Sequence, residues 1–333
     1  MEAAAALAVD AARLAACDSE PIHIPGSIQP YGMLLALGSR GLPVLQASAN
    51  CAALFGRPVE AVIGHFLGEL LPMAEPNVLA SLEARVPDQG SLVLKRLHLG
   101  GGARDGVFHA TAHRSDSCII LELEPAGPDG DADPVEGLHL VVSACAAELQ
   151  AAGSVEEVAA VAARQTRRIT GFDRVLVYRF DEDENGTVVA EDRNGALPSY
   201  LDLRFPASDI PRQARELYRL NRQRLIPDAT YVPVPIVPAL SPLTGRPLDL
   251  SFASLRSVSP IHVEYMRNMG TGSSMSVSLL CDGRLWGLIS CHSLKPRQVP
   301  LEARMVADLV GQIVSLQIAA KEHGRDNDRR MVL

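Results

Sequence analysis

The chain has 333 residues, 47% of them hydrophobic, and a formal net charge of −8. This length allows two domains of ~100–200 residues each. The acidic balance argues against nucleic acid as the main ligand, because a nucleic-acid groove needs a basic footprint. No uninterrupted apolar run reaches the ~18 residues of a membrane span, so we expect no membrane association.

The six cysteines form no CxxC pair, which argues against a zinc site and against a disulfide framework. We expect most of them to be reduced core thiols in a cytoplasmic protein. Cys17 differs, because it precedes the first predicted strand, where there is no core to fill. The alanine-rich residues 1–16 are not read as a signal peptide, since they carry Glu2 and Asp10 and lack a basic leading segment.

Residues 20–125 predict a first domain in which short strands alternate with turns. Its strands are predicted at 33–37, 92–99, 107–114 and 117–124, and its short helices at 49–56 and 59–71. One strand, short helices and then a run of antiparallel strands indicate an α+β domain with helices on one side. A stretch rich in Pro, Gly and Asp follows and predicts a linker at 126–139.

A second domain is predicted over 140–322. Ser154 and Glu157 form a capping box at the start of a helix that Gly171 ends. Strands are predicted at 173–180 and 187–193, a hairpin at 274–280 and 284–292, and a final helix at 302–322. The apolar stripe of that helix either covers the sheet or makes a parallel homodimer, and we expect the dimer. The stripe consists of Met305, Val306, Leu309, Val310, Ile313 and Leu316.

Asp209 lies between Pro206 and Pro211, in a stretch that ordinary secondary structure cannot occupy. Such a loop costs conformational entropy and normally serves a ligand. Asp209 is therefore either part of a ligand site or simply the N-cap of the helix that follows.

Ser274, Ser276 and Ser278 alternate along one predicted strand. A polar face is ordinary for an exposed strand, but serine is a poor strand former, so the alternation also fits a polar cavity wall. Arginines and hydroxyl groups together suit the binding of carboxylates. A single histidine such as His262 or His292 is more often structural than a ligand, and no histidine or cysteine spacing predicts a metal.

Five stretches resemble those of bacterial phytochromes, in the family's order and across nearly all of residues 17–322. They are CDSEPIHIPGSIQPYG (17–32), FDRVLVYRF (172–180), PASDIPRQAR (206–215), LRSVSPIHVEYMRNMG (255–270) and LWGLISCH (285–292). The resemblance implies an α+β chain with a PAS domain followed by a GAF domain, each a central antiparallel sheet flanked by helices. It also implies a knot, in which the N-terminal segment passes through a GAF lasso at Leu225–Leu255.

The same resemblance implies a covalent cofactor, biliverdin IXα. Cys17 would form a thioether to the A-ring vinyl group. Its neighbours Asp18 and Glu20 would raise the pKa of the thiol, which suits slow self-addition better than an enzyme nucleophile. Asp209 would offer its backbone carbonyl to the pyrrole N–H groups, and His262 would help keep the bilin protonated.

The other implied contacts are sorted by the part of the bilin that they touch. One propionate would bind Arg224 and Arg256, with help from Tyr218, and the other would bind Ser259, Ser274 and Ser276. The D-ring would be surrounded by Tyr178, Phe205 and Tyr265, and its carbonyl would accept a hydrogen bond from His292. Ile210 completes the implied set.

The hairpin at 274–292 offers a geometric check, because Ser274, Ser276 and His292 should face one pocket. A two-residue loop would pair Ser276 with Ile289 and turn His292 to the opposite face. We therefore predict a three-residue loop, Cys281 to Gly283, with a bulge there, which would pair Ser276 with Leu288.

The implied function is a red/far-red photoreceptor core, not an enzyme, that senses light by isomerisation of the double bond between rings C and D. Its full-length parent would be a sensor histidine kinase that signals to a response regulator. Residues 323–333 would begin the connection to a PHY domain, without which we expect a poor photocycle. Leu176 and Ser293 depart from the family's usual residues and leave the spectrum open.

Two other function classes compete with the photoreceptor. A GAF-type sensor of another small ligand, such as a cyclic nucleotide, has no need of a thiol ahead of the first domain, and fold alone does not decide between the two. A cysteine-dependent enzyme needs a base beside a low-pKa thiol, and the sequence near Cys17 provides none.

Overall fold

The computed structural model describes residues 20–71, 76–87, 90–99, 106–126 and 134–331. These fall into two compact units, each considered by itself. The first unit is Pro21–Gly130 together with Thr230–Pro260, and the second contains Asp131–Ala229 together with Ile261–Leu333. The chain therefore leaves the second unit after Ala229, contributes to the first, and returns at Ile261.

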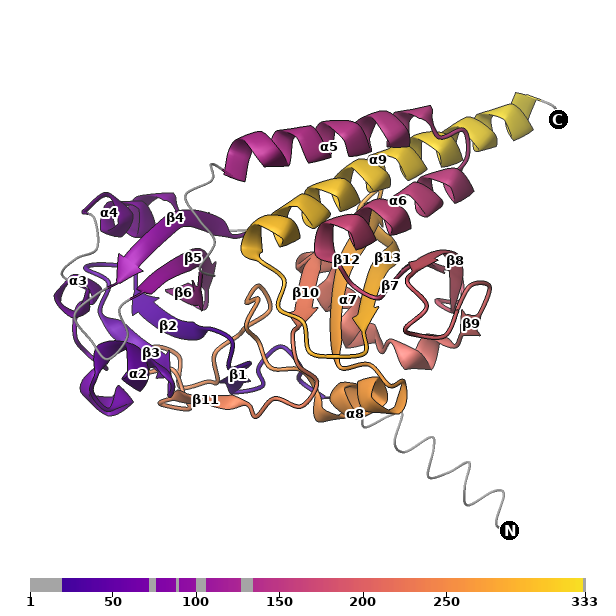
Figure 1. Ribbon diagram of the computed structural model, residues 1–333. Coiled ribbons are helices and arrows are strands. Elements are labelled where there is room, and N and C mark those ends of the chain that lie inside the picture. The colour runs from indigo at the N-terminus through magenta and orange to yellow at the C-terminus, as the bar shows by residue number, and fades with distance from the viewer. Residues whose placement is uncertain (1–19, 72–75, 88–89, 100–105, 127–133, 332–333) are drawn as a thin grey trace, which may run out of the picture. The chain divides into compact units, whose positions relative to one another are not determined.

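The first unit has a seven-stranded sheet in the order β1-β11-β3-β2-β6-β5-β4, with antiparallel pairing throughout (Figure 1). The strands are β1 (Ser27–Ile28), β2 (Met33–Gly38), β3 (Val44–Ser48), β4 (Leu92–Leu99), β5 (Gly106–Ser115), β6 (Cys118–Pro125) and β11 (Val234–Val237). The helices are α2 (Cys51–Phe55), the 3-10 helix η1 (Val59–Ala61), α3 (Leu67–Leu70) and α4 (Pro76–Arg85).

Strand β2 is buried on both faces of this sheet, which explains why each of its six residues is apolar or glycine. One face carries the main apolar cluster with α2 and its neighbours. The other is covered by residues 230–260, whose Leu250 and Leu255 pack against side chains of β2 and β6. The buried Glu122 carboxylate accepts hydrogen bonds from the backbone N–H groups of Ser254, at 3.1 Å, and Leu255, at 2.7 Å.

This covering segment overlaps most of the predicted lasso Leu225–Leu255. It inserts β11 between β1 and β3, pairing Val234 with Ile28 and Val237 with Ala47. A long segment without helices is thus held by strand pairing in the first unit. The knot itself stays a prediction.

The second unit has a six-stranded antiparallel sheet in the order β10-β12-β13-β7-β8-β9. The strands are β7 (Arg174–Phe180), β8 (Gly186–Arg193), β9 (Arg204–Phe205), β10 (Gln223–Ile226), β12 (Ser273–Cys281) and β13 (Arg284–Ser293). The helices are α5 (Pro134–Ala151), α6 (Val155–Thr170), the 3-10 helix η2 (Ala207–Asp209), α7 (Arg212–Leu220), α8 (Pro260–Asn268) and α9 (Leu301–Met331). The two predicted antiparallel sheets with flanking helices are confirmed.

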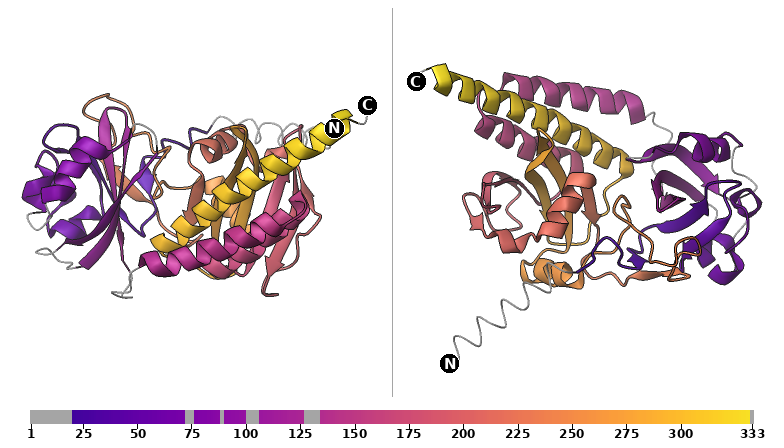
Figure 2. Two further views of the ribbon diagram at one scale, coloured as in Figure 1. Left: turned by 90° about the horizontal axis from the view of Figure 1, so that it is seen from above. Right: turned by 180° about the vertical axis from the view of Figure 1, so that it is seen from behind.

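Helices α5, α6 and α9 lie side by side along one face of this sheet (Figure 2). Helix α6 begins and ends as predicted, with the Ser154 hydroxyl accepting from the Glu157 N–H at 3.1 Å and Gly171 in the left-handed region at φ 70°. The Glu157 carboxylate accepts from Gly153 N–H at 2.6 Å, one residue before the partner that a capping box uses. Helix α5 begins at Pro134, inside the segment predicted as a linker, where proline suits the first turn of a helix.

Residues Leu301–Gly324 of α9 are long and apolar enough to cross a membrane by length and composition, although charged residues interrupt the apolar run. Their packing gives another reason for this composition, because α9 lies against β12 and α6. Val306 and Val310 are buried, whereas Leu309 and Leu316 are exposed. The predicted stripe is therefore divided between a buried face and an exposed one.

Candidate functional site

A cavity lies on the face of the six-stranded sheet opposite α9. Ser274 and Ser276 of β12 line it, whereas the alternating Val277 lies so close to α9 that a Cβ at Gly311 would approach its Cγ1 to 2.6 Å. The empty volume is about 870 Å³ including the solvent at its mouth.

Strand register arranges the polar wall of the cavity in rows. Arg224 on β10 is opposite Ser276 on β12, which is opposite Ser290 on β13. In the next row Ser274 is opposite His292. Since directly opposite residues of antiparallel strands share one face, five polar side chains converge on the same side of the sheet.

The structure brings most of the sequence-predicted residues to this cavity. Those that line it are Tyr178, Phe205, Asp209, Ile210, Tyr218, Arg224, His262, Tyr265, Ser274, Ser276 and His292. Ser278, the third member of the serine alternation, is buried but does not line it.

The structure does not place three of the predicted residues at this cavity. Cys17 is outside the described residues. Arg256 and Ser259 belong to the first unit, whereas the cavity residues all belong to the second. Their proposed contacts with a ligand therefore stay predictions.

Asp209 ends the short helix η2, and the following helix α7 has Pro211 at its N-cap with no side-chain cap. The alternative that Asp209 merely caps α7 is therefore wrong. Its carboxylate accepts a hydrogen bond from the Tyr265 hydroxyl at 3.3 Å, and burial raises its pKa. The turn is held by Arg215, whose guanidinium donates to the carbonyls of Ala207, at 3.0 Å, and Ile210, at 2.5 Å.

Aromatic rings from β7, β9 and the loop between β8 and β9 also line the cavity. The ring centroids of Tyr178 and Phe205 are 6.0 Å apart, and those of Phe205 and Tyr200 are 5.9 Å apart. Burial raises the pKa of Tyr178 to about 12 and raises that of Tyr265 further. Both phenols therefore keep their protons near neutral pH and can donate hydrogen bonds.

The two cavity histidines are neutral at pH 7 in this structure. Burial, assisted by the charge of Arg224, lowers the pKa of His262 to about 4. Burial, then the charges of Arg174 and His262, lowers the pKa of His292 to about 3. The role of His262 in keeping a bilin protonated stays a prediction.

The hairpin between β12 and β13 differs from the prediction. Cys281 pairs with Arg284 across a two-residue loop in which Asp282 and Gly283 both have positive φ, of 51° and 74°. The predicted three-residue loop and the Ser276–Leu288 pair are wrong. The register instead shifts further along, between Leu279 and Leu280, where β13 carries the extra residue. This bulge, and not the loop, places Ser274, Ser276 and His292 on the same face of the sheet.

Residues 17–126 match the PAS fold family, and residues 154–320 match the GAF domain family. Cyanobacterial phytochrome B of Nostoc sp. is 44% identical over 320 residues, covering 96% of this chain and 42% of the relative. The bacteriophytochrome of Pseudomonas aeruginosa is 40% identical over 315 residues, covering 94% of this chain and 42% of the relative.

Two solved structures share the fold over their whole length. The chromophore-binding domain of a Stigmatella aurantiaca bacteriophytochrome has a TM-score of 0.86 at 43% identity, covering 92% of this chain and 100% of that one. This chain belongs to the phytochrome family. The chromophore-binding domain of an R. palustris bacteriophytochrome has a TM-score of 0.82 at 41% identity and covers 93% and 99% of the two chains.

The predicted phytochrome resemblance, with PAS preceding GAF, is thus confirmed. The chain spans about two fifths of the length of the two curated phytochromes described, 42% in each case. What whole phytochromes do beyond this region is therefore a matter for proposal.

Sequence reasoning did not predict several cavity residues of this phytochrome. They are Tyr200, Ile226, Met266, Met269, Thr271, Leu288 and Ser290, while Leu176 had been noted only as a departure from the family. Ser290 carried a usable signal, because it is two residues from His292 on a strand and so shares its face. Tyr200 carried none, since it lies in a loop between β8 and β9.

Proposed function

We propose that this phytochrome chain is a red/far-red light-sensing core that holds biliverdin IXα. The observation that carries the proposal is the cavity, whose lining combines aromatic rings with rows of polar groups. A flat conjugated ligand suits the rings of Tyr178 and Phe205. Its carboxylates suit Arg224 and the serine hydroxyls, because arginine binds carboxylates through paired hydrogen bonds.

Cys17 is proposed as the attachment point. Cys51, Cys118, Cys145, Cys281 and Cys291 are all buried, and none of them lines the cavity. Cys291 precedes His292 on β13 and therefore faces the other side of the sheet. Burial also raises its pKa, which disfavours a reactive thiolate. Cys17 thus remains as the candidate among the cysteines of the chain.

The bilin would supply the absorption of light and the isomerisation of its C/D double bond. The chain's own residues would hold it: the Asp209 carbonyl and His262 at the pyrrole nitrogens, and His292 at the D-ring carbonyl. Arg256 and Ser259 are proposed to assist Arg224 and Ser274 with the two propionates. Threading of the N-terminal segment through Leu225–Leu255 is proposed to bring Cys17 to the cavity.

The test is to mix the purified apoprotein with biliverdin and with phycocyanobilin. We expect a far-red band with biliverdin and zinc-dependent fluorescence of the protein band on a denaturing gel. Cys17→Ser should keep the colour but lose the gel fluorescence, and Cys145→Ser should behave as wild type. No colour with either bilin, together with binding of a cyclic nucleotide, would favour the competing GAF sensor and overturn the proposal.

Membership of the phytochrome family is the basis for proposals about the full-length parent and its assembly. The full-length parent is proposed to be a cytoplasmic, light-regulated sensor histidine kinase that acts on a response regulator. A homodimer is proposed through the exposed face of α9, where Leu316 is 72% exposed. Flash photolysis of the biliverdin adduct of this chain should show incomplete, short-lived photoconversion, and complete stable conversion would contradict that expectation.

A further inference from the structure

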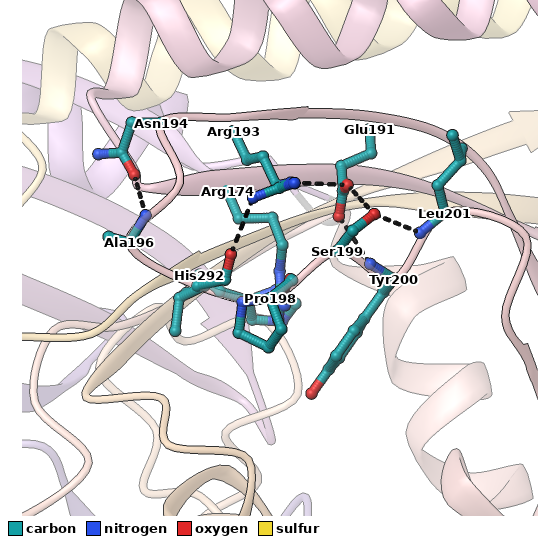
Figure 3. A network of polar contacts seen from close by, with 11 residues as sticks. Arg174, Glu191, Arg193, Asn194, Ala196, Pro198, Ser199, Tyr200, Leu201 and His292 are labelled. Atoms are coloured by element: carbon teal, nitrogen blue, oxygen red, sulfur yellow. Dashed lines mark hydrogen bonds and ion pairs between the residues drawn. The ribbon is translucent and has the colours of Figure 1, made fainter.

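Arg174 is a fully buried cation beside the cavity, at 0% exposure. On β7 it is directly opposite His292 of β13 and Arg193 of β8. Its Nη1 donates to the Pro198 carbonyl at 2.6 Å, and its Nη2 lies 3.4 Å from His292 Nδ1. The centre of its guanidinium lies 3.8 Å from the ring centroid of Tyr200 (Figure 3). Arg174 therefore touches two residues that line the cavity.

The contact with His292 fixes where the imidazole proton sits. An arginine side chain only donates hydrogen bonds and stays charged in proteins. His292 Nδ1 must then act as the acceptor, and the single proton of the neutral ring must be on Nε2. Nε2 is the atom 3.2 Å from the Ser290 hydroxyl, on the face that lines the cavity. His292 thus carries an N–H donor on the cavity face of the sheet, with the Ser290 hydroxyl as its partner in the protein alone.

The loop that carries Tyr200 is held by the same network. Glu191 accepts from the backbone N–H of Tyr200 at 2.9 Å and from the Ser199 hydroxyl at 2.5 Å. The Glu191 carboxylate also forms an ion pair with Arg193, whose Nε lies 3.3 Å from it (Figure 3). Arg174 gains a carbonyl and an aromatic face from this loop, which offsets part of the cost of burying its charge.

We propose that Arg174 is a positioning residue that holds His292 as a neutral Nε2–H donor, so that this end of the cavity selects a ligand group with an acceptor oxygen. In its ligand part this rests on the proposed function, since the D-ring carbonyl of a bilin is such an acceptor. A histidine with the opposite tautomer would offer the cavity a lone pair and repel a carbonyl.

The tautomer can be measured without any ligand. Apoprotein labelled with ¹⁵N-histidine is recorded in long-range ¹H–¹⁵N correlation spectra, and the His292 signals are assigned by their loss in His292→Gln. We expect an unprotonated Nδ1 and a protonated Nε2. Arg174→Met should give a mixture of tautomers and a higher His292 pKa, whereas Arg174→Lys, which keeps a donor and a charge, should restore the wild-type pattern. Arg179→Met, on the same strand outside this network, is the matched control.

Two results would overturn the proposal: a protonated Nδ1 in the wild type, or an unchanged tautomer in a folded Arg174→Met protein. The wild-type spectrum decides even if that variant fails to fold. Biliverdin titration in a Cys17→Ser background adds the ligand readout, with about tenfold weaker binding expected for Arg174→Met, equivalent to one lost hydrogen bond of about 1.4 kcal/mol. A wild type that shows the expected tautomer but takes up no bilin would sink the proposed function and leave the positioning role standing.

Discussion

Ser274 and His292 face each other directly across β12 and β13, although the two-residue loop of their hairpin would by itself place them out of register. A regular ladder from Cys281–Arg284 would pair Ser274 with Cys291. The shift between Leu279 and Leu280 adds one residue on β13 and brings His292 into line. The polar wall of the cavity therefore depends on one irregularity a few residues along the same two strands, at Leu279 and Leu280.

Replacing Ser274 and Ser276 by alanine together should weaken biliverdin binding. Both serines line the cavity: Ser276 is in the row of Arg224, and Ser274 is in the next row. A propionate of the bilin is proposed to bind both hydroxyls. Hydrogen bonds to a charged group contribute ~1.5–3 kcal/mol each, so the loss of two should lower the affinity roughly a hundredfold or more. Absorbance titration in a Cys17→Ser background, where covalent capture cannot hide the loss, provides the measurement.

Ser278→Ala is the matched control for that double variant. Ser278 is on the same strand and the same face as Ser274 and Ser276, but it does not line the cavity. Its buried Oγ has no hydrogen-bond partner among the described residues. Removing an unsatisfied buried hydroxyl should leave binding unchanged and stability equal or slightly higher. Equal affinities for the double variant and Ser278→Ala would remove the serines from the proposed site.

Local sequence patterns predicted the strands and turns well, because alternation and glycine signals are properties of the segments themselves. The start of α6 after Ser154 and its end at Gly171 are examples. The bulge was misplaced, since nothing local to Trp286 distinguishes a bulged residue from a paired one. Register is set by packing on both faces of the sheet, which a single strand does not encode.

Long-range pairing was the other limit. Strand β11 forms only because the segment after Ala229 crosses to the sheet of the first unit. Most cavity residues were predicted by resemblance to a family, not by residue patterns alone. Arg174 lay inside a recognised stretch, yet its role depends on its cross-strand position beside His292.

Arg215→Gln should loosen the turn that carries Asp209. Arg215 bridges the carbonyls of Ala207 and Ile210, and its other amino group pairs with Glu184. Without these charge-assisted hydrogen bonds the turn should lose about 1–2 kcal/mol of local stability. Amide hydrogen exchange of residues 207–210 should then be roughly tenfold faster or more.

Exchange followed by mass spectrometry, with far-UV circular dichroism to confirm the fold, is the measurement for Arg215→Gln. Arg219→Gln is its control, because Arg219 is on the same helix and, within the described residues, donates to the exposed Glu216 carboxylate. Equal protection of the turn in the two variants would show that Arg215 does not hold it.

Leu316→Glu should convert the proposed homodimer to a monomer. Leu316 is 72% exposed on α9, and Met305 and Leu309 of the same helix are 45% and 41% exposed. A charge buried in an apolar interface costs several kcal/mol when it has no partner. Light scattering coupled to size-exclusion chromatography gives the mass, with Leu243→Glu, at another site of 54% exposure, as the control. A monomeric wild type would contradict this association.

Acid should weaken the first unit through His113, which is 0% exposed. Burial lowers its pKa from 6.5 to about 4, and the charge of Asp249 opposes this in part. Between these two pKa values the unfolded chain binds a proton at His113 that the folded unit does not bind. The free energy of unfolding therefore has its full value above pH 6.5 and decreases as the pH falls toward 4. The loss at pH 5 is on the order of 2 kcal/mol. Urea unfolding at pH 7.5 and 5 should show a smaller acid loss for His113→Phe than for wild type, because phenylalanine binds no proton. The exposed His65→Gln should match wild type, and an equal acid loss in all three proteins would place the acid sensitivity elsewhere.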